Sequence, residues 1–142
     1  MVFNFIKEKR TKELKEQIIR DIEKKYQIAF PEAYVQYHLE HDLDKISVCV
    51  FNIKDEPYEV SRMIPLSGEG LNFELYVSDN RENGYIDSRF YPVAMDRGEN
   101  VYYWDSASGE IFYFPVDDIE NPIFIAKDIN EFFALLESST KL

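Results

Sequence analysis

Three carboxylates, Asp96, Glu99 and Asp105, stand close together in the sequence, at the expected ends of strands. Carboxylates that converge can act as a general acid and a general base, so this set could belong to a small hydrolase. No histidine lies near them, and the sequence has neither a phosphate-cradling Gly-rich loop nor a GxSxG nucleophile elbow. Aspartate in a turn commonly binds its own backbone. We therefore interpret the three as turn residues and predict no catalytic residue.

The two histidines, His38 and His41, are also candidates for chemistry, because their i, i+3 spacing can place both on one helix face. The spacing is not the i, i+4 of a zinc-binding HExxH helix, and no third ligand is evident. We interpret both as ordinary residues at a polar helix end. Residues 79–87 have the composition of a calcium loop, but Arg81 stands at a ligand position, which excludes that function. The sequence thus predicts neither a metal nor a cofactor.

Aromatic residues are dense between residues 101 and 114. Strand alternation predicts that Tyr103 and Tyr113 lie on one face of a sheet. The opposite face would hold Tyr102, Trp104, Phe112 and Phe114. Exposed tyrosines beside Asp or Glu would suit a protein interface, where their rings supply contact area at low entropy cost. The alternative is that helices and loops cover both faces.

The chain has 142 residues and a formal net charge of −11, and its acidity is unevenly distributed. Residues 1–30 carry eight Lys or Arg and five Asp or Glu, whereas the remaining residues carry eight and twenty-two. An acidic body disfavours nucleic acid, whose binding depends on basic groups that neutralise phosphates. It would attract a basic protein partner and accelerate the encounter, although acidity can equally serve solubility alone.

The length and the hydrophobic content of 45% suit one domain over residues 1–142 that needs no disulfide to hold its core. The single cysteine, Cys49, lies in an apolar run and is expected to be buried. Residues 1–10 lack the apolar stretch of a signal peptide, and no run approaches the ~20 apolar residues of a membrane span. We therefore expect a cytoplasmic protein without a membrane interaction.

Apolar periodicity predicts an α+β fold, with two N-terminal helices and a C-terminal helix packed on a mainly antiparallel sheet. The N-terminal helices are expected over residues 11–26 and 31–42. The C-terminal helix should begin after Asp128, with Glu131 completing a capping box.

Between these helices the period changes to two, which predicts strands. They are expected at residues 46–51, 60–66, 73–77, 90–96, 101–105, 110–114 and 123–126. A polar loop is expected over residues 79–84, ending at the Asn83-Gly84 turn signal. Only short turns separate residues 90–96, 101–105 and 110–114, so these strands must pair as an antiparallel meander.

Four segments resemble motifs of the SUKH superfamily, in the same order along the chain. Residues 30–34 resemble its LPxxY element, and residues 91–100 resemble its iPfAxDxgGN segment. Residues 105–113 resemble its D…G.vy hairpin, and residues 125–133 resemble its closing iAdSFeeFl helix. Two departures stand out: residues 40–43 replace an Asn-Gly-Gly turn, and Glu99 replaces the second glycine of the GGN turn.

This resemblance implies an α+β fold and a non-catalytic immunity protein that binds and neutralises a cognate bacterial toxin, often a nuclease. It also leaves open a regulatory or scaffolding module, since the superfamily includes a fungal regulator of cell-wall synthesis. A basic toxin domain would complement the acidic body. The residues predicted to bind the partner are Asp96, Glu99, Tyr103, Asp105, Tyr113, Asp117 and Asp118.

Overall fold

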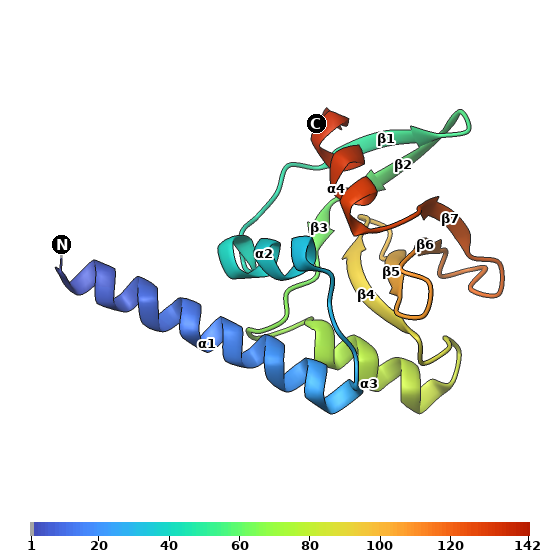
Figure 1. The fold of residues 1–142 in the computed structure, drawn as a ribbon. Coiled ribbons are helices and arrows are strands. Elements are labelled where there is room, and N and C mark those ends of the chain that lie inside the picture. The colour runs from blue at the N-terminus through green and yellow to red at the C-terminus, as the bar shows by residue number, and fades with distance from the viewer. Residues whose placement is uncertain (1) are drawn as a thin grey trace.

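The computed structural model describes the backbone of residues 2–142 and the side chains of residues 11–142. Helices and antiparallel strands form an α+β fold, as expected (Figure 1). The helices are α1 (Val2–Tyr26), α2 (Glu32–His41), α3 (Phe73–Asn83) and α4 (Ile129–Ser138). No helix among residues 2–142 combines the length and the apolar composition that a membrane span requires.

The strands form two sheets. A three-stranded sheet has the order β2-β1-β8, with β1 (Cys49–Ile53), β2 (Glu56–Val60) and β8 (Thr140–Lys141). A five-stranded sheet has the order β3-β4-β5-β6-β7, and every neighbouring pair is antiparallel. Its strands are β3 (Arg62–Met63), β4 (Phe90–Met95), β5 (Val101–Asp105), β6 (Ile111–Phe114) and β7 (Ile123–Ala126). The predicted meander of β4, β5 and β6 is confirmed.

The helices bury their apolar residues mainly on one face of the five-stranded sheet. On this face Tyr102 and Trp104 are buried together with Ile111 of the next strand. The helical residues packed there are Ile19 and Ile22 of α1, Tyr34 of α2, Phe73 and Val77 of α3, and Ile129 and Phe132 of α4. This is the main core, and Phe51 of β1 joins the smaller sheet to it.

The opposite face of the five-stranded sheet has a thinner cover. Its core consists of Ile64, Phe90, Met95, Val101, Tyr103 and Phe114. The residues that pack over it from outside the sheet are Tyr76 of α3, Ile86 of the α3–β4 loop and Ile119 of the β6–β7 loop. One helix and two loops thus cover the second face, whereas all four helices contribute to the main core.

Two predicted elements in the middle of the chain are wrong. Residues 73–77 are not a strand, because they belong to α3, and of the loop expected over residues 79–84 all but the cap residue Gly84 belong to the same helix. The helix begins where the Asn72 side chain accepts a hydrogen bond from the Leu75 N–H at 3.0 Å. It ends at Gly84, whose φ of 69° fits a left-handed cap. The predicted turn at Gly84 is therefore real, but it terminates a helix.

The early strands differ in their bounds from the prediction. The strand expected at residues 46–51 begins only at Cys49, which is buried as predicted. The strand expected at residues 60–66 is replaced by β2, which ends at Val60, and by the two-residue β3. A hairpin at Lys54 and Asp55, both with positive φ, joins β1 to β2.

Candidate functional site

The three carboxylates considered for catalysis do not converge. Asp105 pairs with Phe90 at one end of the β4–β5 ladder, whereas Asp96 follows Met95 at the other end. At about 3.3 Å per residue the strand separates them by roughly 15–20 Å, too far for an acid–base pair. Glu99 lies with Asp96 in the turn between the strands. Asp105 therefore cannot form a catalytic pair with Asp96 or Glu99.

Asp96 organises the turn between β4 and β5. Its Oδ1 accepts a hydrogen bond from the Asn100 backbone N–H at 2.9 Å, and its Oδ2 accepts one from the Tyr113 hydroxyl at 2.6 Å. The Asn100 side chain donates to the same carboxylate and accepts from the Val116 N–H at 2.8 Å. Asp96 and Tyr113 thus join the turn to β6, and a structural role accounts for their contacts.

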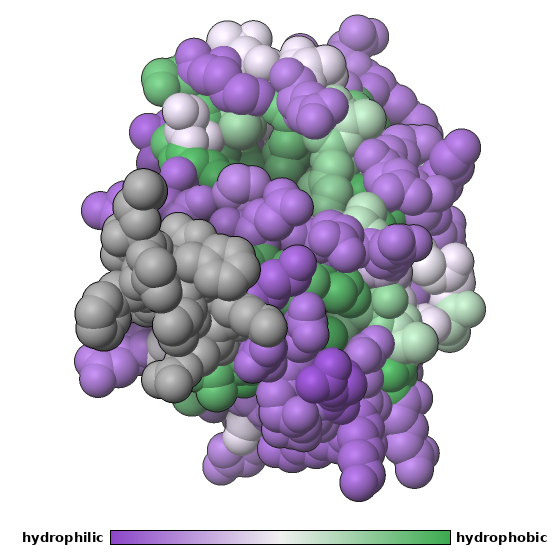
Figure 2. All heavy atoms as spheres, turned by 60° about the vertical axis from the view of Figure 1, so that its left-hand side comes forward, coloured by the Kyte–Doolittle hydropathy of each residue, from purple (hydrophilic) through white to green (hydrophobic). Residues whose placement is uncertain are grey.

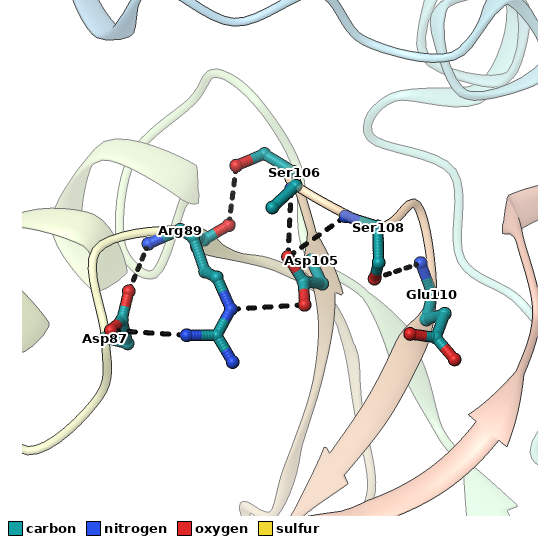
Figure 3. A network of polar contacts seen from close by, with 7 residues as sticks. Asp87, Arg89, Asp105, Ser106, Ser108 and Glu110 are labelled. Carbon is teal, nitrogen blue, oxygen red and sulfur yellow. Dashed lines mark hydrogen bonds and ion pairs between the residues drawn. The ribbon is translucent and has the colours of Figure 1, made fainter.

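Asp105 organises the opposite end of the sheet (Figure 3). Its Oδ1 accepts from the Ala107 N–H at 2.9 Å, and its Oδ2 accepts from Nε of Arg89 at 3.2 Å. Burial opposes ionisation of Asp105, but the hydrogen bonds from the Ala107 backbone and from Arg89 lower its pKa below the usual value. Arg89 also pairs with Asp87 at 3.3 Å, so one guanidinium is shared between the carboxylates of Asp87 and Asp105.

The predicted sharing of a face by Tyr103 and Tyr113 is wrong. The register pairs Tyr102 with Tyr113, and Tyr103 with Phe112. Directly opposed residues lie on the same face, so Tyr113 joins Tyr102 on the helix-covered side. Tyr103 lies on the thinly covered side and is only 2% exposed. The alternative expectation, that helices and loops cover both faces, describes the structure better.

A groove opens on the thinly covered face, between α3 and the loops that follow Gly84 and Phe114. Its volume is about 350 Å³. The lining is largely aromatic and apolar: Tyr76, Tyr85, Ile86, Val101, Tyr103, Phe114, Val116 and Ile119. The polar lining residues are Asp79, Asn80 and Glu99. We call this set of eleven residues the acidic groove.

The charges of the acidic groove are uniform in sign. Asp79 and Glu99 are its charged lining residues, and both are exposed. Neither carboxylate makes a hydrogen bond or an ion pair with any residue among 11–142. Burial raises the pKa of Tyr76, Arg62 lowers it, and both Glu99 and Asp79 raise it, so the two carboxylates act on one phenol. Burial raises the pKa of Tyr103 to about 12, which keeps the phenol neutral.

Asp117 and Asp118 extend this acidity beside the groove. They lie between two of its lining residues, Val116 and Ile119, and both side chains are exposed. Asp118 accepts a hydrogen bond from the Asn121 side chain at 2.7 Å. Four of the seven predicted partner-binding residues, Glu99, Tyr103, Asp117 and Asp118, are thus in or beside the groove. Their contact with a partner stays a prediction, as it does for Asp96, Asp105 and Tyr113.

Sequence reasoning did not find Asp79 and Asn80, because it assigned residues 79–84 to a loop rather than to α3. It also did not find Tyr85, which lies in the loop after the Gly84 cap. The i, i+3 and i, i+4 spacing of Tyr76, Asp79 and Asn80 was the available signal, and it becomes visible once α3 is recognised as a helix. Tyr85 is 71% exposed, which is unusual for so large an aromatic residue.

Two other hollows of comparable size carry balanced charge. One of about 400 Å³ is lined by two acidic and two basic residues, Asp42, Asp44, Lys45 and Arg62. Another of about 410 Å³ has Glu137 and Lys141 at its edge. In the view of Figure 2, apolar side chains show mainly in recesses between hydrophilic ones. Uniform charge and aromatic lining therefore distinguish the acidic groove from these hollows.

The prediction of ordinary residues at a polar helix end is confirmed for His41, the last residue of α2, and is wrong for the buried His38. His38 is 1% exposed, and its Nδ1 lies 2.5 Å from Oδ1 of Asp42. His41 is exposed and pairs with Asp44 at 2.8 Å. Within residues 11–142 no group of three or more His, Cys, Asp or Glu side chains is placed to hold a metal ion.

Comparison with known proteins supports the resemblance of the motifs. The model of the SMI1 / KNR4 family (SUKH-1) matches residues 13–135. A search of the curated proteins found no match. The matched range covers most of α1, the five-stranded sheet and most of α4. The chain therefore belongs to the SMI1 / KNR4 family (SUKH-1).

Proposed function

We propose that this protein is a non-catalytic immunity protein that binds a bacterial toxin domain, a nuclease in particular, and neutralises it. The observation that carries the proposal is the acidic groove. Asp79 and Glu99, whose carboxylates have no partner among residues 11–142, line this groove together with aromatic residues, on the face of the sheet that the helices leave least covered. Membership in the SUKH-1 family supports it, because the motif resemblance implies toxin immunity.

The chemistry of the groove favours a basic protein as its partner. Surfaces of nucleases that hold nucleic acid are basic, so an acidic surface can cover them by charge complementarity. Aromatic residues such as Tyr85 supply contact area at an interface, whereas carboxylates at the rim accelerate the encounter. The net charge of −11 also attracts a basic partner over a longer range.

Coexpression with a candidate toxin domain, sought among the genes beside its own, tests this function. We expect coexpression to restore growth, and the two purified proteins to elute as one complex in size-exclusion chromatography. A complex without growth rescue would indicate a regulatory or scaffolding module instead. Neither complex nor rescue at low salt, where charge attraction is strongest, would contradict the proposal.

A further inference from the structure

The acidic groove has the chemistry of a socket for one cationic side chain. A cation over the face of a tyrosine ring is attracted by the ring quadrupole, and a nearby carboxylate adds direct charge attraction. Tyr76, Tyr85 and Tyr103 line the groove together with Asp79 and Glu99. Tyrosines and two carboxylates therefore line one groove, a combination suited to a positive charge.

The dimensions favour a side chain rather than a larger element. A volume of about 350 Å³ is near the lower end of the ~300–1,000 Å³ typical of sites for small molecules. A helix about 10 Å wide would not enter such a hollow. One long side chain, projecting from a partner surface, could enter it and leave Asp117 and Asp118 to meet the charges around it.

Arginine fits this lining better than lysine. Its planar guanidinium stacks on aromatic faces and carries five donors in a fixed fork, whereas the lysine ammonium is a compact, strongly hydrated point charge. Acceptors for several donors are present, since the carboxylates of Asp79 and Glu99 have no partner among residues 11–142. The phenol oxygen of Tyr103 already accepts a hydrogen bond from the Asn80 side chain at 2.9 Å, and this bond holds the two lining residues together.

The protein's own cations near the groove are occupied or lie outside it. Arg97 is adjacent in the same turn as Glu99, but Glu59 holds its guanidinium at 2.5 and 2.7 Å. Arg62 is close enough to influence Tyr76, yet it is not among the residues that line the groove. The negative field of Asp79 and Glu99 is therefore directed to solvent and available to a partner.

From these observations we infer that the acidic groove takes an arginine side chain from a basic segment of the protein partner. This inference rests on the proposed function and names the group that the site recognises. It makes Asp79, Glu99 and Tyr85 the residues that select the partner, although Asp79 and Tyr85 belong to a part of the chain that no motif resemblance includes.

The direct test uses three blocked peptides of sequence Gly-Gly-X-Gly-Gly, where X is arginine, lysine or citrulline. NMR titration of the full chain should show the arginine peptide shifting the resonances of Tyr85, Tyr103 and Glu99. Citrulline keeps the shape but not the charge, so it should cause no comparable shift. Equal binding of citrulline or lysine, shifts confined to another surface, or no shift up to the solubility limit would overturn the inference.

Matched variants separate this inference from the proposed function. Asp79→Asn with Glu99→Gln removes two charges from the groove, and Asp55→Asn with Glu56→Gln removes two from the β1–β2 hairpin. The first pair should weaken the toxin complex by about two- to fivefold per carboxylate. The second pair should leave affinity nearly unchanged. If both pairs bind alike, the inference fails while the proposed function stands. If no toxin complex forms, the proposed function fails and the peptide titration alone decides the inference.

Discussion

His38 and Asp42 form a buried pair, with Nδ1 of the histidine 2.5 Å from Oδ1 of the aspartate. Asp42 also accepts hydrogen bonds from the Leu66 N–H at 2.8 Å and from the Ser67 hydroxyl at 2.9 Å. One carboxylate thus connects the end of α2 to the segment between β3 and α3. Because α3 forms one wall of the acidic groove, this pair fixes the wall relative to the rest of the fold.

Replacing Asp42 by alanine should destabilise the protein strongly. The substitution leaves His38, the Leu66 N–H and the Ser67 hydroxyl without their acceptor, and both His38 and Leu66 are buried. We expect the free energy of unfolding to fall by about 3–5 kcal/mol, as measured by urea denaturation. Asp44→Ala is the control, because Asp44 is exposed and its loss should cost less than about 0.5 kcal/mol. Equal losses in both variants would contradict the role of the buried pair.

Asp42 should also make stability depend on acid pH. Burial opposes its ionisation, but hydrogen bonds from His38, Leu66 and Ser67 lower its pKa below the ordinary 3.8. A carboxyl with a lowered folded-state pKa stabilises the protein above its unfolded-state pKa. That contribution is lost as the pH falls from about 3.8 through the lower folded-state value. Unfolding free energies from pH 7 to pH 2 should therefore fall more steeply in the wild type than in Asp42→Asn, and parallel profiles would refute this.

The bond between the Tyr113 hydroxyl and Asp96 should stabilise the fold rather than the toxin complex. Tyr113→Phe removes one donor to a buried carboxylate, so the free energy of unfolding should fall by about 1–2 kcal/mol. Affinity for the toxin, measured by calorimetry at a temperature where both proteins are folded, should stay within about twofold. A large loss of affinity with unchanged stability would instead indicate that Tyr113 contacts the partner.

The sequence predicted the β4–β6 meander because its turns are short and its strands alternate strongly. It did not predict the sheet faces, because a one-residue difference in hairpin register exchanges them. That register depends on the turn from Ser106 to Gly109, where Asp105 binds the Ala107 N–H and Gly109 takes a φ of 84°. Alternation within each strand was visible, but which residue of β6 opposes Tyr103 was not.

Two further elements were hidden for different reasons. The β1–β2 hairpin turns through Lys54 and Asp55, both with positive φ. Such turns usually carry Asn-Gly, so the Lys-Asp sequence did not predict a turn here. Helix α3 contains Phe73, Leu75 and Val77, whose alternation imitates a strand over five residues. The helical period can be recognised only over the longer stretch from Phe73 to Asn80. The missed helix is why Tyr76, Asp79 and Asn80 of the acidic groove escaped sequence reasoning.

Glu99 should lower the stability of the fold and strengthen binding of the toxin. Its φ of 66° lies in the left-handed region, where the family motif carries glycine, and a non-glycine residue costs roughly 1–2 kcal/mol there. Glu99→Gly should relieve this strain, and after the extra entropy of the unfolded chain we expect a gain of about 0.5–1 kcal/mol. The same variant should bind the toxin more weakly, because the groove loses a carboxylate. Glu99→Gln separates the effects: it should lose affinity without gaining thermal stability.

The caps at the two ends of α3 should each stabilise the fold. Asn72→Ala removes the acceptor of the Leu75 N–H and should cost about 1 kcal/mol of unfolding free energy. Gly84→Ala should cost a similar amount, because φ is 69° and the added methyl group meets nothing within 4 Å, so backbone strain is the whole effect. Ser78→Ala, at an exposed position inside the helix, should be neutral or slightly stabilising, since alanine has the higher helix propensity. Neutral effects at both caps would mean that residues 73–83 do not form a helix in solution. Because Asp79 and Asn80 reach the groove only from a helix, the same result would also remove the structural basis for the arginine socket.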